Sequence, residues 1–396
     1  MSKIDDLIKE LCPDGVDVWS LGDLEDSGKI KLGRGMVISK NDIADNPGDY
    51  PVYSSSATGL GEFGRYSKYM FDDERITWSV DGGGRFFHRK AHKYSVTNVS
   101  GWIKVNDANI ITKYLYYALD NLWLTKKFDY IKKAHPSVIR NEYNIPIPPL
   151  EVQKEIVRVL DSFTELEAEL EAELEARKKQ YEYYRNTLLT FGDSVAWKPM
   201  GEVGELIRGN GLQKKDFTEE GFPCIHYGQI YTYYGTFAKE TKSFVSCSLA
   251  EKLVKAACGD VIITNTSENI NDVGKAVAWC GNQAVVTGGH ATVFKPKLVS
   301  GKYFAYYSQT GDFYKDKKRY AKGTKVIDVS TKDMSKIKIP VPSIEKQQQI
   351  VSILDKFEKL TNDISVGLPA EIEARRKQYE YYRNKLLTFK ELECSK

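Results

Sequence analysis

Residues Ala176–Phe191 read ARKKQYEYYRNTLLTF, and residues Ala374–Phe389 read ARRKQYEYYRNKLLTF, so the two stretches differ at only two positions. A related sequence precedes each copy: IPIPPLEVQKEIVRVLDSF begins at Ile145 and IPVPSIEKQQQIVSILDKF begins at Ile339. Chance does not produce internal identity over this length, so the chain contains a long duplicated unit. The segments between the copies, about 25 to 145 and 204 to 338, differ from each other. This arrangement predicts two differently specialised heads on one repeated scaffold.

The duplicated stretches are predicted to be long helices. Their apolar residues recur at steps of three, four or seven, from Ile156 to Leu188 and from Ile350 to Leu386, which is one stripe of a helix. Each stripe follows a Pro-x-Pro sequence, which suits the residues just before a helix. About forty residues at 1.5 Å each give a helix of roughly 60 Å. Gly367-Leu368-Pro369 predicts a kink in the second helix.

Two copies of one unit that pack face to face most simply obey a pseudo-two-fold axis. The helices would then be antiparallel, with a head at each end. Three tandem Glu-Leu-Glu-Ala units span Glu165 to Ala176. They are either an ordinary solvated helix face or a means of changing helix length. We predict an α+β fold with heads at 1–145 and 193–339 and helices at 146–192 and 340–396.

Composition narrows the class of protein. The 396 residues are 41% hydrophobic and 28% charged, which is globular composition, and the net charge is only +3. No run of eighteen apolar residues offers a membrane span, and the first residues do not resemble a secretory signal, so we expect a cytoplasmic protein. The six cysteines form no C-x-x-C pair, which argues against a zinc module.

Basic residues alternate with aromatic ones in both heads, within Phe86–Tyr94, Lys126–Arg140 and Tyr314–Asp328. Lysine and arginine neutralise phosphates, while Tyr, Phe and His offer contacts to bases and sugars. A solvated surface is the alternative for any one cluster, but each head carries one late in its segment. The predicted DNA-binding residues are Arg85, His88, Arg89, Lys90, Lys93, Lys132, Lys133, His135, Arg140, Lys214, Lys215, Lys317, Lys318, Arg319, Lys322 and Lys325.

The duplicated RKQYEYYRN-type helices, the IPIP and IPVP sequences and the four-residue repeats resemble the specificity subunits of type I restriction-modification systems. The resemblance covers essentially the whole chain. It implies two target-recognition domains that read the halves of a bipartite site in double-stranded DNA. It also implies that the helices dock two methyltransferase subunits and, through them, motor-nuclease subunits. The predicted partner-interface residues are Tyr181, Tyr184, Tyr379 and Tyr382.

Catalytic motifs are missing from the sequence. There is no G-x-x-x-x-G-K-[ST] loop for ATP and no Asn/Asp-Pro-Pro-aromatic tetrapeptide for amino methylation. Gly59–Gly64 matches G-x-G-x-x-G, but no apolar helix follows, and His88 with His92 lacks a third metal ligand. We therefore predict no catalysis in this chain, with S-adenosylmethionine, ATP and magnesium in partner subunits. The alternatives are a stand-alone DNA methyltransferase or nuclease, and a coiled-coil scaffold whose heads bind protein.

Overall fold

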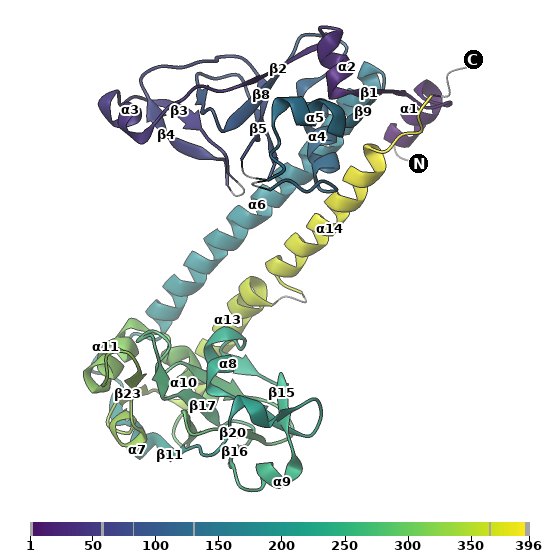
Figure 1. Cartoon of the computed structure of the whole chain (residues 1–396). Helices are drawn as coiled ribbons and strands as arrows, with labels where there is room; N and C mark the ends of the chain where they lie inside the picture. The colour runs from purple at the N-terminus through teal and green to yellow at the C-terminus, as the bar shows by residue number, and fades with distance from the viewer. Residues whose placement is uncertain (1–2, 57–58, 82, 130, 364–365, 393–396) are drawn as a thin grey trace. The chain divides into compact units, whose positions relative to one another are not determined.

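The structure is a computed structural model that describes residues 3–56, 59–81, 83–129, 131–363 and 366–392. The chain forms two units: unit 1 comprises Met1–Glu169 and Glu373–Lys396, and unit 2 comprises Leu170–Ile372. Each unit holds one variable segment, which we call its head, together with parts of both helical copies (Figure 1). Both heads mix helices and strands, as the sequence predicted.

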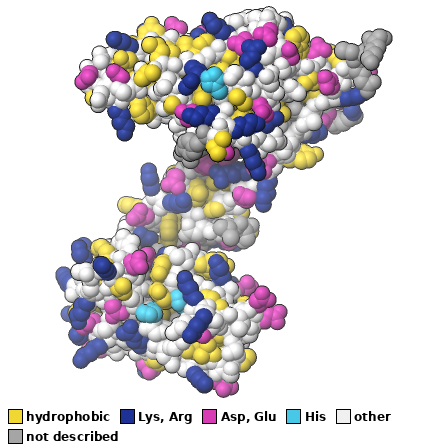
Figure 2. Space-filling view, in the orientation of Figure 1, with side chains coloured by type: hydrophobic (Ala, Val, Ile, Leu, Met, Phe, Trp, Pro, Cys, Tyr) yellow, Lys and Arg dark blue, Asp and Glu magenta, His cyan; other side chains and the backbone are white. Residues whose placement is uncertain are grey.

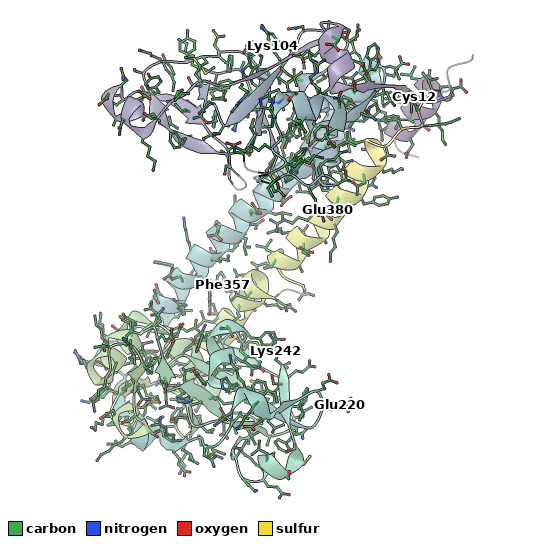
Figure 3. The ribbon with its side chains drawn as sticks, in the orientation of Figure 1. Cys12, Lys104, Glu220, Lys242, Phe357 and Glu380 are labelled. Carbon is green, nitrogen blue, oxygen red and sulfur yellow. The ribbon has the colours of Figure 1, made fainter. Side chains whose placement is uncertain are left out.

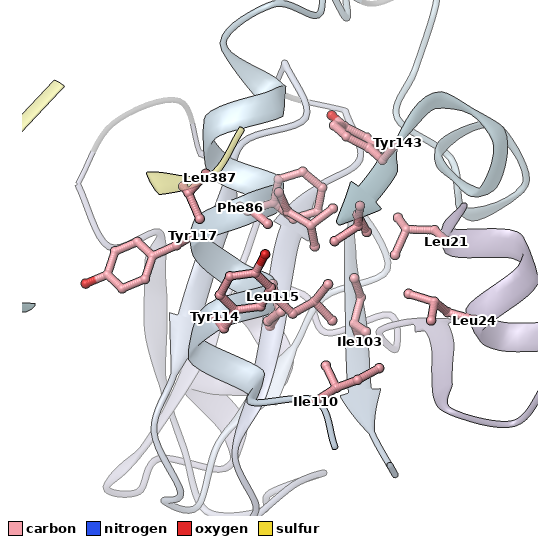
Figure 4. Packing of buried hydrophobic residues seen from close by; sticks show 14 of the residues in the cluster. Leu21, Leu24, Phe86, Ile103, Ile110, Tyr114, Leu115, Tyr117, Tyr143 and Leu387 are labelled. Carbon is pink, nitrogen blue, oxygen red and sulfur yellow. The ribbon is translucent and has the colours of Figure 1, made fainter. Parts of the chain in front are cut away.

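The head of unit 1 contains an antiparallel sheet of order β2-β8-β5-β6 and a smaller sheet of order β4-β3-β7. Their bounds are β2 Ile30–Arg34, β3 Tyr50–Tyr53, β4 Glu62–Tyr66, β5 Arg75–Ser79, β6 Phe86–Arg89, β7 Ser95–Val96 and β8 Ser100–Val105. The helices are α1 Lys3–Leu11, α2 Leu21–Asp26, α3 Lys40–Asp45, α4 Thr112–Trp123 and α5 Pro136–Glu142. Figure 4 shows the core, where sheet residues such as Phe86 and Ile103 meet Tyr114 and Leu115 of α4.

The head of unit 2 contains sheets of order β11-β21-β17-β19-β14 and β12-β15-β13-β20-β16, and a small β18-β22 pair. The strands are β11 Gly204–Arg208, β12 Phe217–Thr218, β13 Phe222–Ile225, β14 Phe237–Ala238, β15 Ser243–Val245, β16 Val254–Ala256, β17 Val261–Thr264, β18 Thr266–Ser267, β19 Ala276–Trp279, β20 Val285–Thr287, β21 Ala291–Pro296 and β22 Ile327–Asp328. The helices are α7 Met200–Val203, η1 Lys214–Asp216, α8 Tyr227–Thr232, α9 Cys247–Ala250, α10 Gly301–Tyr307, α11 Gly311–Tyr320 and α12 Thr331–Met334.

The two heads share a common core of strands although their sequences differ and unit 2 has additional strands. By order and pairing, β2 corresponds to β11, β8 to β21, β5 to β17 and β6 to β19. In the smaller sheets β3 pairs with β7 in parallel, as β13 does with β20. A two-stranded ribbon closes each head: β1 (Asp17–Ser20) pairs with β9 (Asn144–Ile147), and β10 (Ala196–Pro199) pairs with β23 (Lys338–Val341).

The first duplicated stretch forms one helix, α6 (Leu150–Leu188), of 39 residues. The second forms two helices, α13 (Ile344–Asn362) and α14 (Leu368–Leu386), so the kink that Gly367-Leu368-Pro369 predicted is a break. Ile364 of the predicted stripe lies outside the described residues. Both long helices begin just after their proline sequences, α6 after Pro149 and α13 after an N-cap formed by Ser343. The proline boundaries were therefore predicted correctly.

The helical copies pack through equivalent aromatic residues within each unit. In unit 1, Phe163 of α6 stacks on Tyr382 of α14 with ring centroids 5.5 Å apart. In unit 2, Phe357 of α13 stacks on Tyr184 of α6 at 5.3 Å; Figure 3 labels Phe357. Arg376 and Glu167 form an ion pair, so residue numbers on α6 rise as those on α14 fall. Within unit 1 these two helices are therefore antiparallel.

Each head is held on its helix by the same set of hydrogen bonds. Asp161 of α6 accepts from Lys113 and from Tyr117 (2.6 Å), and Asp355 of α13 accepts from Lys302 and from Tyr306 (2.7 Å). The side-chain oxygen of Gln153 accepts from the amide of Ile111 (2.9 Å). The corresponding bonds of Gln347 include the amide of Ser300 (2.8 Å). Because these contacts are paired one for one, the duplication includes the docking of each head.

Candidate nucleic-acid interface

In each unit, the ends of corresponding strands bring several turns to one end of the larger sheet, β2-β8-β5-β6 or β11-β21-β17-β19-β14. We call this sheet the main sheet and this end of it the loop edge. In unit 1 the loop edge comprises the described residues of 35–38, 54–56, 80–85, 97–99 and 131–135. In unit 2 it comprises residues 209–215, 226–227, 265–267, 288–290 and 321–330. Loops that are held on a rigid sheet are common positions for binding residues. The loop edges are therefore the candidate interface.

Matched backbone hydrogen bonds show that the two loop edges are equivalent. The amide of Val80 donates to the carbonyl of Val99 (2.9 Å), as Asn265 does to His290 (2.8 Å). The amide of Ala134 donates to Val80 (3.1 Å). Likewise, the amide of Val329 donates to the carbonyl of Asn265 (3.0 Å). The late basic segments of the two heads, which contain Ala134 and Val329, therefore occupy the same place in the fold.

The side chains at these equivalent positions differ. After β3, unit 1 presents Ser54, Ser55 and Ser56, and the hydroxyl of Thr97 donates to Ser54 (2.9 Å). After β13, unit 2 presents His226 and Tyr227, whose ring lies 4.9 Å from that of His290. One backbone framework thus carries small hydroxyls in one head and a cluster of aromatic rings in the other.

The imidazole of His226 is neutral near pH 7. Burial lowers its pKa to about 4, and the charge of Lys214 and the neighbouring His290 act in the same direction. The ring nitrogen Nδ1 accepts from the amide of Gly228 (3.3 Å), which caps α8. The ring is only 6% exposed, so it supports the ring of Tyr227, 4.4 Å away, rather than meeting a ligand itself.

Several predicted DNA-binding residues of unit 1 lie at its loop edge. Lys132 and Lys133 are exposed there and are paired with Glu142 and Asp81. Arg85 is half-buried and lies over the ring of Phe87 and near Asp120 of α4, whereas His135 caps α5 with its ring nitrogen. Tyr130, in the same segment, lies outside the described residues. Figure 2 shows basic side chains scattered among hydrophobic ones on the viewed face of both heads.

The basic cluster that ends β6 lies elsewhere. The β5–β6 hairpin places Phe86 next to Trp78 at the loop edge and Arg89 next to Arg75 at the opposite edge. Lys90 and Lys93 follow Arg89, and Lys93 contacts the ring of Tyr69. These lysines are therefore separated from Lys132 and Lys133 by the length of the hairpin.

In unit 2, the predicted basic residues of the loop edge are exposed: Lys214, Lys215, Lys322 and Lys325. Lys318 and Arg319 are also exposed, on the neighbouring helix α11, where Arg319 pairs with Asp316. Lys322 pairs with Asp333. The structure thus places most of the second cluster on one surface.

Four predicted DNA-binding residues have structural roles instead, because their charges are satisfied within the head. Arg89 is 5% exposed and donates to Thr77 and to the carbonyl of Leu60. Lys317 is 4% exposed and donates to the carbonyls of Asn271 and Val273, and burial lowers its pKa to about 8.

The other two residues that need correction are partly buried and held in ion pairs. Arg140 forms ion pairs with Glu25 and Asp26, which tie α5 to α2. His88 is bonded to Glu74 (2.6 Å), and burial lowers its pKa. Basic residues next to aromatic ones also occur where a charge supports a core, and spacing alone did not separate the two cases.

The tyrosines predicted to face a partner serve mainly to join the helices. Tyr181 is buried and donates to Glu358 (3.2 Å), while Tyr184, Tyr379 and Tyr382 pack on Phe357 or Phe163. Of these, Tyr184 is 38% exposed, and the most exposed tyrosines of the repeats are Tyr183 and Tyr381, at 66% and 63%. They occupy the same position in the two copies. Helical periodicity would have found them, because each precedes a stripe residue by one position.

Sequence reasoning also missed an arginine at each loop edge. The guanidinium Nε of Arg34 donates to the carbonyl of Asn98 (3.0 Å), and that of Arg208 donates to the carbonyl of Gly289 (2.9 Å). The sequence signal is an Arg-Gly dipeptide at the end of the first long strand in each head. The match was hidden because the two dipeptides lie at different distances from the first strand of each head. The dipeptide begins fifteen residues after Trp19 of β1 but eleven residues after Trp197 of β10.

The motifs that could have indicated other chemistry have ordinary structural explanations. Strand β4 begins at Glu62, inside the G-x-G-x-x-G match, where a dinucleotide site would need a helix. His92 stacks on Tyr94. Among the described residues, no group of three or more His, Cys, Asp or Glu side chains could hold a metal ion. In the same residues, no helix is both long and apolar enough to cross a membrane.

Comparison with known proteins places the chain in a family. Residues 13–176 and 194–374 both match the type I restriction modification DNA specificity domain. The chain is 36% identical over 359 residues to a type I restriction enzyme specificity subunit of Escherichia coli, covering 85% of this chain and 84% of the relative. It is 32% identical over 356 residues to a putative type I specificity subunit of Haemophilus influenzae, with 85% of each chain covered.

Solved structures agree on the fold. The specificity subunit of M. genitalium matches with a TM-score of 0.56 at 17% identity, over 94% of this chain and 96% of that one. A chain from a study of complex assembly and conformational transition of the type I system matches with a TM-score of 0.58 at 18% identity, over 95% and 98%. The chain belongs to the specificity subunits of type I restriction-modification systems. Subunits of this kind do not themselves cut or methylate DNA.

Proposed function

We propose that each loop edge reads one half of a bipartite site in double-stranded DNA. The observation that carries this proposal is that the two loop edges have matched backbones and different side chains. A reader of two unlike half-sites needs one way of approaching DNA and two sets of base contacts. In this proposal, residues 1–145 and 193–339 are the target-recognition domains, and 146–192 and 340–396 are the helical elements.

The loop-edge and neighbouring surface residues that we retain for DNA contact are Lys132, Lys133, His135, Lys214, Lys215, Lys318, Arg319, Lys322 and Lys325; the side chains of Arg85, Lys90 and Lys93 lie away from that surface. The retained lysines and arginine would neutralise phosphates and make binding depend on salt. The serines of unit 1 and Tyr227 and His290 of unit 2 would contact bases. A scaffold with protein-binding heads would need no such division between matched and divergent positions.

The helical elements would set the distance between heads, with α6 antiparallel to α13 and α14. They would also dock two methyltransferase subunits and, through them, motor-nuclease subunits, which would supply S-adenosylmethionine, ATP and magnesium. We infer that Tyr183 and Tyr381 face those subunits. Packing within the chain does not require identical residues at exposed positions, whereas two copies of one partner would.

Mapping the methylated motif in cells that express this chain with its methyltransferase subunit tests both parts of the proposal. The expected motif has two unlike halves and a nonspecific spacer. Deleting Glu169–Ala172 removes about 6 Å of helix and leaves a rotation of about 40°. One base pair advances about 3.4 Å and turns by about 35°. We expect unchanged halves and a spacer that is shorter by one base pair.

The control keeps the helix length and changes its charge. Replacing Glu169 and Glu171 by Gln should leave the motif and its spacer unchanged. An unaltered spacer in the deletion variant would refute the role of α6 in setting distance. A single undivided motif, or none, from the unmodified chain would refute the reading of two half-sites.

A further inference from the structure

Arg34 and Arg208 occupy equivalent positions in heads that otherwise present different side chains. Each ends the first strand of its main sheet, and each donates through Nε to a carbonyl of the turn that precedes the neighbouring strand, β8 or β21. Both side chains are exposed. The acceptors are a backbone carbonyl of Asn98 and one of Gly289, so this arrangement does not depend on which side chains those turns carry.

The backbone beside each arginine is also preserved. The amide of Gly35 donates to Ser100 (3.0 Å) and that of Gly209 donates to Ala291 (2.9 Å). A Cβ atom would lie 2.1 Å from the carbonyl oxygen of Val96 at the first glycine and 2.3 Å from that of Gly288 at the second. Contacts this short are not tolerated, so the close approach requires glycine. We call Arg34–Gly35 and Arg208–Gly209 the Arg-Gly corners; the backbone of both heads requires the glycine at this place.

What the two corners have in common indicates what they would contact. If the heads read different bases, a side chain that both hold in the same geometry must meet a part of DNA that does not change with sequence. That part is the phosphodiester backbone. A guanidinium has five N–H donors, and anchoring one edge on a carbonyl leaves others for a phosphate oxygen.

We propose that Arg34 and Arg208 bind the DNA phosphate backbone at corresponding places in the two half-sites and so set how each loop edge approaches the base pairs. This inference rests on the proposed function, because it takes DNA as the ligand of the loop edges. It separates the surface into matched residues, which position the DNA, and divergent residues, which read it.

The two arginines differ in their neighbouring charges, so we expect them to contribute unequally to DNA binding. Arg208 lies 3.5 Å from a carboxylate oxygen of Asp328, which offsets part of its charge. Among the described residues, no carboxylate lies within ion-pair distance of Arg34. Replacing Arg34 is therefore expected to have the larger effect on DNA binding.

The experiment measures the affinity of the purified complex, containing this chain and its methyltransferase subunits, for two short duplexes at several salt concentrations. One duplex carries the mapped motif and the other has a scrambled sequence. Arg34→Ala should weaken binding to both duplexes about tenfold, since a hydrogen bond to a charged group is lost. The slope of log affinity against log salt should fall by about 0.9 for each arginine replaced.

Lys104→Ala and Lys295→Ala are matched controls. These lysines lie on β8 and β21, at the edge of each sheet opposite the arginines, and pair with Asp73 and Asp260. Figure 3 labels Lys104. Both controls should bind DNA like the unmodified complex.

The outcomes separate the two proposals. Unchanged affinity and salt slope in Arg34→Ala and Arg208→Ala, with a motif-selective unmodified complex, would overturn only the phosphate contact. A relaxed half-site with an unchanged salt slope would also overturn it, because the arginine would then act by shaping the turn. An unmodified complex that binds the scrambled duplex as tightly as the motif would instead defeat the proposed function.

Discussion

Unit 1 and unit 2 attach a head to a helix in the same way but balance the charge at that junction differently. In unit 1 a buried carboxylate comes from the head, as Asp120 on α4, and burial raises its pKa while Arg383 and Arg85 oppose the shift. In unit 2 the corresponding head residue is Gln309, and the acid comes from the scaffold, as Glu358 on α13. Glu358 accepts from the amide and hydroxyl of Thr236 and from Tyr181.

The difference shows which contacts were duplicated and which were adapted. The same contacts recur in both units, formed by Lys113, Tyr117 and Asp161 in unit 1 and by Lys302, Tyr306 and Asp355 in unit 2. The acid at the helix junction, by contrast, lies on the head helix α4 in unit 1 and on the scaffold helix α13 in unit 2. Thr164 stands in α6 where α13 has Glu358. A buried acid needs donors, so only one fits at each junction. One head can therefore replace the other only if each junction still contains one buried acid.

The largest expected effect comes from the duplicated contact. Asp161→Ala and Asp355→Ala should each destabilise the attachment of one head by about 2 to 3 kcal/mol, because a partly buried lysine and a tyrosine lose their acceptor. Amide hydrogen exchange should report the first loss in α4 and the second in α10. Asp14→Ala and Glu219→Ala, which change exposed acids, should alter neither helix. Unequal losses from the two variants would show that the junctions are not energetically equivalent.

The adapted contact is tested by moving an acid between units. Gln309→Asp places a second carboxylate at the unit 2 junction, next to the hydroxyl of Thr236 that Glu358 already binds. We expect a loss of about 1 kcal/mol, because repulsion from Glu358 is partly offset by Arg185, which donates to the side chain of Gln309. Adding Glu358→Thr, which copies Thr164 of unit 1, should recover part of it. Thermal melting of the full complex measures both, and a double variant less stable than Gln309→Asp would contradict the interpretation.

The smallest expected effect distinguishes the loop edges by pH. The pKa of folded His226 is about 4, below the ordinary value of 6.5, so the folded state prefers the neutral ring. Its contribution to stability is complete above about pH 6.5 and is lost as the pH falls towards 4. We expect the protection of α8 amides from hydrogen exchange to fall over this window.

His226→Asn, which keeps a side-chain acceptor for the cap, should remove that pH dependence. The turn after β3 in unit 1 has serines in place of the histidine and should show none. A pH response of α8 that persists in the His226→Asn variant would assign it to another group, with His290 the first to examine.

The sequence by itself determined the repeated plan. The near-identity of Ala176–Phe191 and Ala374–Phe389 showed the duplication, the three-and-four spacing of apolar residues showed the helices, and the prolines placed their first turns. These features are local: helical periodicity and proline geometry act over a few residues, so they can be read from the chain. An interruption of the second helix at Gly367 to Pro369 was predicted for the same reason, although as a kink rather than the break that the structure shows.

Only the tertiary structure decided which side chains share a surface. Arg89 and Lys317 have the sequence surroundings of DNA-binding residues. Each is nevertheless buried in its head and donates hydrogen bonds to backbone or hydroxyl groups there. Arg34 stands alone in the sequence, yet the β2–β8 pairing sets it against Asn98, 64 positions away. Burial and strand pairing depend on contacts between distant segments of the chain. A charged side chain is stable either when it is buried with hydrogen-bond partners or when it is exposed on a binding surface. Local pattern cannot distinguish those two cases, because what separates them is the set of neighbours that folding brings to the charge.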